Sequence, residues 1–184
     1  MSFSAPSRPR RTYETGVVTR ILRVLALLGW LGVTIVVLRR YPELPATIPT
    51  HFGLGGEADA VGPRWSILVL LGIFWLMIAA LTWLSRRSAA FNYPVEVTAQ
   101  NAQRVYREGE RQMVWVNLTL VPVGAGVALL ALGDDGVALL WSGLVLMVAV
   151  LVVGVVRAVR AGRAEGGADN ETDGETAGPA QHEA

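Results

Sequence analysis

The chain of 184 residues contains neither cysteine nor lysine. Without cysteine, disulfide bonds, thiolate metal sites and cysteine nucleophiles are excluded. Charged residues make up only 17% of the chain, whereas hydrophobic residues make up 52%. A soluble domain has about a quarter of its residues charged and cannot bury so much apolar surface. The composition therefore indicates a membrane protein.

Four long stretches have almost no charge. A helix that crosses the hydrocarbon layer of about 30 Å needs about 20 residues. Because backbone groups in hydrocarbon must be bonded within their segment, uninterrupted runs of this length favour helices. We predict an all-α membrane protein with four transmembrane helices, which span residues 21–38, 65–85, 112–133 and 136–156.

The first run has a second interpretation, because basic residues precede it as they do in a secretory signal peptide. We favour a membrane span, since the run is long, ends at Arg39 and Arg40 and has no small-residue cleavage site after it. Arg23 lies near its start, where the guanidinium can reach the membrane surface. Inside the four spans Arg23 is the one ionisable residue.

Arginine is distributed unequally between the two sides that four spans define. Thirteen of the sixteen arginines lie before or at the start of the first span, where Arg23 is counted, in the 86–111 connection or after the last span; the other three are Arg39, Arg40 and Arg64. Cytoplasmic flanks retain arginine, so we expect a multi-pass protein of the cell membrane with both termini in the cytoplasm. The 39–64 loop is then outside the cell.

The soluble segments complete the expected domain organisation. Residues 1–15 form a basic tail and residues 159–184 an acidic tail, and both compositions predict disorder around a transmembrane domain at 16–158. Thr98 is a candidate N-cap for a helix that runs through Arg111 into the third span. We expect that helix to be solvated near the membrane surface, with a docking site for a cytoplasmic partner as the alternative.

Two further expectations concern packing inside the bundle. Trp30 and Trp75 lie in the middle of their spans and should pack between helices. The small residues Gly124, Gly126 and Gly143 should permit close approach of the third and fourth helices. Polar residues within the spans should form hydrogen bonds between helices.

The outer loop, YPELPATIPTHFGLGGEADAVGPR at 41–64, is rich in proline and glycine. Proline stiffens the backbone and glycine permits turns, so the loop should have a defined shape. We expect an extended segment at 48–52, a turn at 53–56 and a return toward Trp65, in the form of a hairpin on the outer mouth of the bundle. Its candidate chemical groups are His51, Glu57 and Asp59, which could clip the loop together, contact a partner or bind zinc. We expect no metal and no cofactor.

An Ile-Pro-x-His-Phe segment followed by Gly-Glu-x-Asp, between two apolar helices, resembles a small domain of unknown function in bacterial membrane proteins. The N-terminal part of SdpI-like immunity proteins contains this domain. The resemblance covers about 25–80 and implies a functional loop motif at Pro49, His51, Phe52, Gly56, Glu57 and Asp59. We expect four spans, without the further membrane region of SdpI-like proteins, so protection against a toxic peptide does not transfer directly.

These observations favour a non-enzymatic protein embedded in the lipid bilayer. No Ser/His/Asp set or paired-carboxylate span is present. The outer loop would recognise or support a partner, either an external peptide or another membrane protein, as immunity, sensory or accessory proteins do. A small oligomeric transporter or channel is the alternative. The short basic tail offers too little positive surface for nucleic acid.

Overall fold

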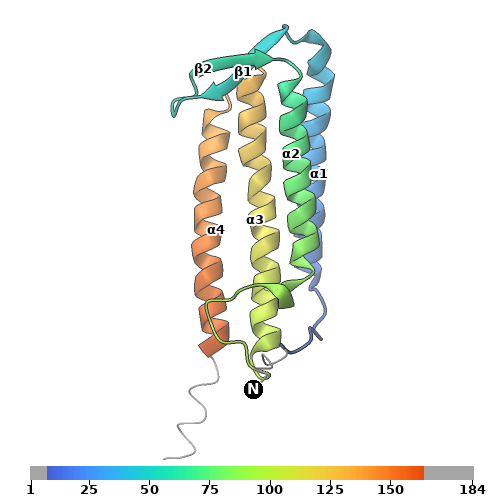
Figure 1. Ribbon diagram of the computed structural model, residues 1–184, viewed down its shortest axis with the longest axis vertical. Coiled ribbons are helices and arrows are strands. Elements are labelled where there is room, and N and C mark those ends of the chain that lie inside the picture. Colours follow the sequence, from blue (N-terminus) through green and yellow to red (C-terminus); the bar gives the residue numbers. More distant parts are fainter. Residues whose placement is uncertain (1–7, 164–184) are drawn as a thin grey trace, which may run out of the picture.

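The computed structural model describes residues 8–163, and its main elements are four long helices. They are α1 (Val17–Arg40), α2 (Ser66–Ser85), α3 (Ala102–Ala131) and α4 (Val137–Arg163). All four are long and apolar enough to cross a membrane, as the sequence predicts. The helices run side by side, as Figure 1 shows.

The two ends of the bundle differ. A β-hairpin made of β1 (Thr47–Phe52) and β2 (Ala58–Pro63) lies across one end, which we call the hairpin end. The start of α1 and the end of α4 lie at the other, which we call the terminal end (Figure 1). Two 3-10 turns, Tyr41–Glu43 and Ser88–Ala90, follow α1 and α2. The two-stranded sheet lies in the loop where the sequence predicts an extended segment and a return, and the rest of the architecture is helical.

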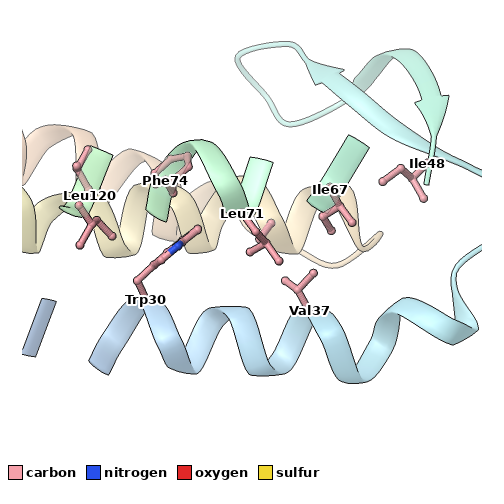
Figure 2. Packing of buried hydrophobic residues seen from close by; sticks show 10 residues of the cluster. Trp30, Val37, Ile48, Ile67, Leu71, Phe74 and Leu120 are labelled. Carbon is pink, nitrogen blue, oxygen red and sulfur yellow. The ribbon is translucent and has the colours of Figure 1, made fainter. Parts of the chain in front are cut away.

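The apolar core is centred on α3, which packs against each of the other three helices. Trp30 of α1 stacks on Phe74 of α2, with ring centroids 4.7 Å apart, and both rings face α3 (Figure 2). Ile48 of β1 extends this core to the hairpin end. The prediction that Trp30 packs between helices is therefore confirmed. Association of helices in lipid depends on such close packing, because lipid tails are as apolar as the side chains.

Glycine sets the distance between α3 and α4. A Cβ on Gly126 would lie 2.5 Å from the backbone nitrogen of Leu140, and one on Gly143 would lie 2.8 Å from that of Val123. These two glycines have the predicted role, because backbone atoms of the facing helix occupy the space beside them. Gly124 does not: it faces Trp30 and Phe74, so it makes room for the aromatic pair rather than for α4.

Polar side chains join the helices within the apolar part of the bundle. The Trp75 indole Nε1 donates a hydrogen bond of 3.0 Å to Thr34 Oγ1, which ties α2 to α1. Asn117 Nδ2 of α3 donates to Thr82 Oγ1 of α2 at 2.9 Å. The expected hydrogen bonds between helices are therefore present at these positions.

Three segments at the terminal end differ from expectation. Residues 8–15, expected to be disordered, lie against α3 and the α2–α3 connection and make hydrogen bonds to both. Residues 102–111 are not a solvated surface helix, because Val105, Tyr106 and Glu110 are buried, the last two in contact with segment 8–15. The helix also begins later than predicted, with Asn101 rather than Thr98 as its N-cap. Helix α4 continues to Arg163, and the remainder of the predicted acidic tail lies outside the described residues.

Candidate functional site

The hairpin carries all the residues of the sequence motif. Its strands are antiparallel, with Thr47 opposite Pro63 and Phe52 opposite Ala58. Ile48 is only 2% exposed and points into the bundle core (Figure 2). The turn contains Gly56 with φ of 86°, and a Cβ there would collide with the Val137 side chain. Glycine is required at this position both for its backbone conformation and for its close approach to α4.

Several contacts hold the hairpin on the helices. The indole Nε1 of Trp141 in α4 donates a hydrogen bond of 3.1 Å to the carbonyl oxygen of Leu54 at the tip. At the base, the backbone N–H of Arg64 donates to the carbonyl of Ala46 at 2.9 Å and closes the hairpin, while the buried Ile48 packs β1 onto the helix core. The tip and the base are thus both fixed, so the hairpin is a platform with a set position on the bundle.

The structure brings two of the three chemical candidates together. His51 Nδ1 lies 2.5 Å from Asp59 Oδ1, and their side chains are 71% and 52% exposed. Glu57 stands apart from this pair: its carboxylate lies over Gly53 and Gly55, in the space that a Cβ would need. In the described part of the chain, no three His, Cys, Asp or Glu residues are grouped as a metal site requires.

The apolar motif residues take part in a pocket beneath the hairpin. Pro49 and Phe52 line it from β1, together with Ile48 and Thr50. The pocket has a volume of about 210 Å³, and its other apolar walls come from α2 and α3, through Ile67, Val69, Leu70, Ile73, Val127 and Ala131. It can accept an apolar side chain from outside the protein.

A second polar constellation, at the terminal end, centres on Glu110. This residue of α3 is only 1% exposed. Its carboxylate accepts four hydrogen bonds, at 2.7 Å from Thr15 and Arg23 and at 2.9 Å from Arg11 and Tyr13. Glu110 therefore joins the N-terminal segment and α1 to α3 through one side chain.

The electrostatics of this cluster favour a charged carboxylate. Two guanidiniums contact it, so the cluster has one more positive than negative charge. Burial raises the pKa of Tyr13 to about 12, so its phenol is neutral at physiological pH and can donate to Glu110. The Nε of Arg23 is buried and has no hydrogen-bond partner in the structure.

Sequence reasoning missed the role of Glu110, because the residue lies in a charged stretch just before the third predicted span. Two signals pointed to it. Glu110 is four residues from Tyr106 and four from Val114, and both are buried on the same face of α3. Arg23 within the first span also required an acidic partner, because an unpaired buried charge is strongly unfavourable.

Comparison with known proteins gives a family match that includes the hairpin and parts of the helices on either side of it. Residues 28–75 match the family described as Domain of unknown function (DUF1648). This region holds most of α1, the whole hairpin and the first half of α2, but not Glu110 or the segment that covers it. It also holds both rings of the Trp30–Phe74 stack.

The chain is also 36% identical over 91 residues to a protein of Archaeoglobus fulgidus described as "Uncharacterized protein". The aligned region covers 45% of this chain and 48% of that relative, so the match spans about half the length of each. No solved structure matches the chain.

Proposed function

We propose that this protein is a non-enzymatic multi-pass protein of the cell membrane whose hairpin recognises a partner outside the cell. The distribution of arginine supports the orientation. Thirteen of the sixteen arginines lie at or near the terminal end of the bundle, and three lie near the hairpin end. Since cytoplasmic flanks retain arginine, the terminal end faces the cytoplasm and the hairpin faces outward.

The observation that carries the proposal is the exposure of apolar side chains on a hairpin whose position is fixed. Leu54 at the tip is 81% exposed and Val61 of β2 is 71% exposed. Apolar side chains on a rigid, water-facing platform are typical of surfaces that contact another protein. The pocket beneath Pro49 and Phe52 offers an adjoining site for one apolar side chain of that partner.

The chemistry of the hairpin supports binding rather than catalysis. His51 contacts a single carboxylate on the open surface, and no serine or threonine hydroxyl hydrogen-bonds to it within residues 8–163. General acid–base or nucleophilic catalysis requires a positioned nucleophile within reach of its base. A hydrogen-bonded pair that links the two strands is the simpler role for His51 and Asp59.

The partner that fits this surface is an extended segment of an external peptide or of another membrane protein. The resemblance of the Ile-Pro-x-His-Phe and Gly-Glu-x-Asp segments to SdpI-like immunity proteins supports a role of the immunity, sensory or accessory type. An extended segment could lie along the hairpin and place one apolar side chain in the pocket.

Photo-crosslinking tests this proposal, because the chain has no cysteine of its own. Leu54→Cys and Val61→Cys would each carry a benzophenone label, and Ala99→Cys in the exposed α2–α3 connection would be the matched control. We expect irradiated cell membranes to give the same protein or peptide adduct from both hairpin labels and not from Ala99. Adducts with lipid alone at both hairpin positions would contradict the proposal.

A small oligomeric transporter or channel is the second candidate, and the position of α4 favours it. This helix packs chiefly against α3, and its valine-rich outer face, including Val148 and Val152, is exposed. A second copy of the chain could cover that face. Reconstituted protein that remains monomeric and gives no ion or solute flux in liposomes would exclude this candidate.

A further inference from the structure

The terminal end has a pocket whose walls are mainly arginine. It has a volume of about 420 Å³ and is lined by Arg11, Thr15, Arg20, Arg23, Val24 and Arg86. These residues come from the N-terminal segment, the first turns of α1 and the end of α2. No acidic residue lines the pocket, and Glu110 is the one carboxylate that any of its arginines contacts within residues 8–163.

The positive charge of the pocket is only partly balanced. A carboxylate has about four acceptor positions, and Glu110 already accepts four hydrogen bonds, so it cannot serve further guanidiniums. No ion pair or hydrogen bond engages the guanidiniums of Arg20 and Arg86 in the described part of the chain. Four arginines against one carboxylate leave an excess of three positive charges.

Two further features favour an anion in this place. The Nε of Arg23, a residue that is only 8% exposed, is buried without a partner, although buried donors are almost always paired. The adjacent N-terminus of α1 has no side-chain cap and no acidic residue in its first turn, so its N–H groups add to the positive potential.

The surface that leads away from the pocket is apolar. From Arg20, exposed side chains follow one face of α1 at spacings of four, four, three and four residues. They are 42% to 55% exposed and run toward the hairpin end, as Val24, Leu28, Leu31 and Ile35. A ligand with an anionic head and a long apolar chain would match the arginine pocket and the apolar face of α1 that adjoins it.

We propose that this pocket binds the phosphate of an anionic phospholipid in the leaflet at the terminal end. Arginine recognises phosphate through paired N–H donors, so Arg20 and Arg86 would hold the headgroup beside Arg23. An acyl chain would lie along Val24 and Leu28. The proposal is independent of what the hairpin binds, because the two sites lie at opposite ends of the bundle.

Native mass spectrometry of the full chain in detergent tests the proposal with two probes, phosphatidylglycerol and phosphatidylcholine. The informative variant is R20Q/R86Q, since both residues are exposed and their guanidiniums have no partner in the fold. The matched control is R160Q/R163Q, which removes the same charge from exposed positions at the same end of the bundle.

We expect wild-type protein to retain one phosphatidylglycerol in preference to phosphatidylcholine. The R20Q/R86Q change should weaken that binding by about tenfold or more, because each well-placed arginine contributes measurably to attraction of anionic lipid. The control should change it less than about twofold. The variant R20K/R86K, which keeps the charge, should retain most of the preference.

Three results would overturn the proposal. One is equal retention of the two lipids by wild-type protein. Another is an equal loss in both double glutamine variants, which would show an effect of net charge alone. The third is displacement of phosphatidylglycerol by inorganic phosphate at the same concentration, which would assign the pocket to a soluble anion. An unchanged thermal midpoint of R20Q/R86Q in phosphatidylcholine would verify its fold, and R20Q alone is the substitute if the double variant unfolds.

Discussion

The two ends of the bundle are stabilised in different ways. At the hairpin end, apolar side chains such as Ile48 are buried, and the ion pairs Arg40–Asp134 and His51–Asp59 are exposed. At the terminal end, one buried carboxylate, Glu110, holds an otherwise polar segment on the helices. The stabilising contacts of the hairpin end are therefore spread over several residues, whereas those of the terminal end meet at one carboxylate.

The cause of this difference lies in where arginine accumulates. The terminal end contains most of the arginines, and some of them must lie close to the helices. A guanidinium can be buried only with a compensating negative charge, and Glu110 supplies it for Arg11 and Arg23 together. A single substitution should therefore disrupt the terminal end more than the hairpin end.

The largest effect is expected from Glu110→Gln. The change preserves the volume of the side chain but leaves the buried Arg23 without a counter-charge. Loss of one partner from a buried pair costs about 3 to 5 kcal/mol. Unfolding in mixed detergent micelles, followed by tryptophan fluorescence, would measure this loss, and residues 8–16 should become open to proteolysis.

Glu108→Gln is the matched control for that variant. Glu108 pairs with Arg111 on the same helix, and their side chains are 17% and 45% exposed. Pairs at this spacing on a helix surface contribute less than about 1 kcal/mol. If the two variants lost the same stability, the terminal end would not depend on Glu110 in the way the structure indicates.

The next effect is expected from Ile48→Ala at the hairpin end. Ile48 is 2% exposed, so the shorter side chain would leave a cavity beneath the hairpin. Such changes cost about 2 to 3 kcal/mol when the site collapses in part. Hydrogen exchange of the backbone at 47–63 would report the loosened hairpin. Val61→Ala, at a position 71% exposed, should leave that exchange nearly unchanged.

A smaller effect is expected from Gly126→Ala, which tests the contact between α3 and α4. The new Cβ would lie 2.5 Å from a backbone atom of Leu140, so the two helices would have to separate. Overpacking of this kind costs about 1 to 2 kcal/mol. Gly72→Ala in α2 is the control, because nothing lies within 4 Å of its Cβ. Equal midpoints of thermal unfolding for the two variants would contradict the close helix contact.

The smallest effect is expected from His51→Ala. Its pair with Asp59 is exposed, and exposed pairs contribute less than about 1 kcal/mol. A thermal midpoint within a few degrees of wild type would support a surface clip between the strands. A large loss of stability, or a metal that purifies with wild-type protein and not with the variant, would assign His51 a greater role.

Long apolar runs made the four helices predictable, because nothing but a helix satisfies the backbone of such a run in lipid. The role of a single residue was predictable where its position in the span allowed one environment. Trp30 lies in the middle of its span, far from the membrane surface that tryptophan prefers, so it was expected to pack between helices. Gly124 shows the limit: it is two residues from Gly126 on α3, and a helix turns about 200° over that distance. Sequence alone does not say which of the two glycines faces α4.

The terminal end was harder to predict for a physical reason. Segment 8–15 is polar and arginine-rich, and composition alone predicts disorder for such a segment. Its order comes from long-range contacts with Glu110 and Gln103, which lie about 90 residues further along the chain. At the hairpin, the pairing of His51 with Asp59 rather than Glu57 depends on the irregular register between the strands.

Cysteine accessibility in intact cells tests most directly the central claim, that the four helices cross the membrane and separate the two ends. Ala58 in β2 and Ala99 before α3 are both exposed, so a cysteine at either position can be reached by a reagent. Ala102, the first residue of α3, is fully buried and would not report on the side of the membrane. We predict that a membrane-impermeant maleimide labels Ala58→Cys in intact cells, and labels Ala99→Cys only after the cells are permeabilised. Labelling of both positions in intact cells, or of Ala99→Cys alone, would contradict the account.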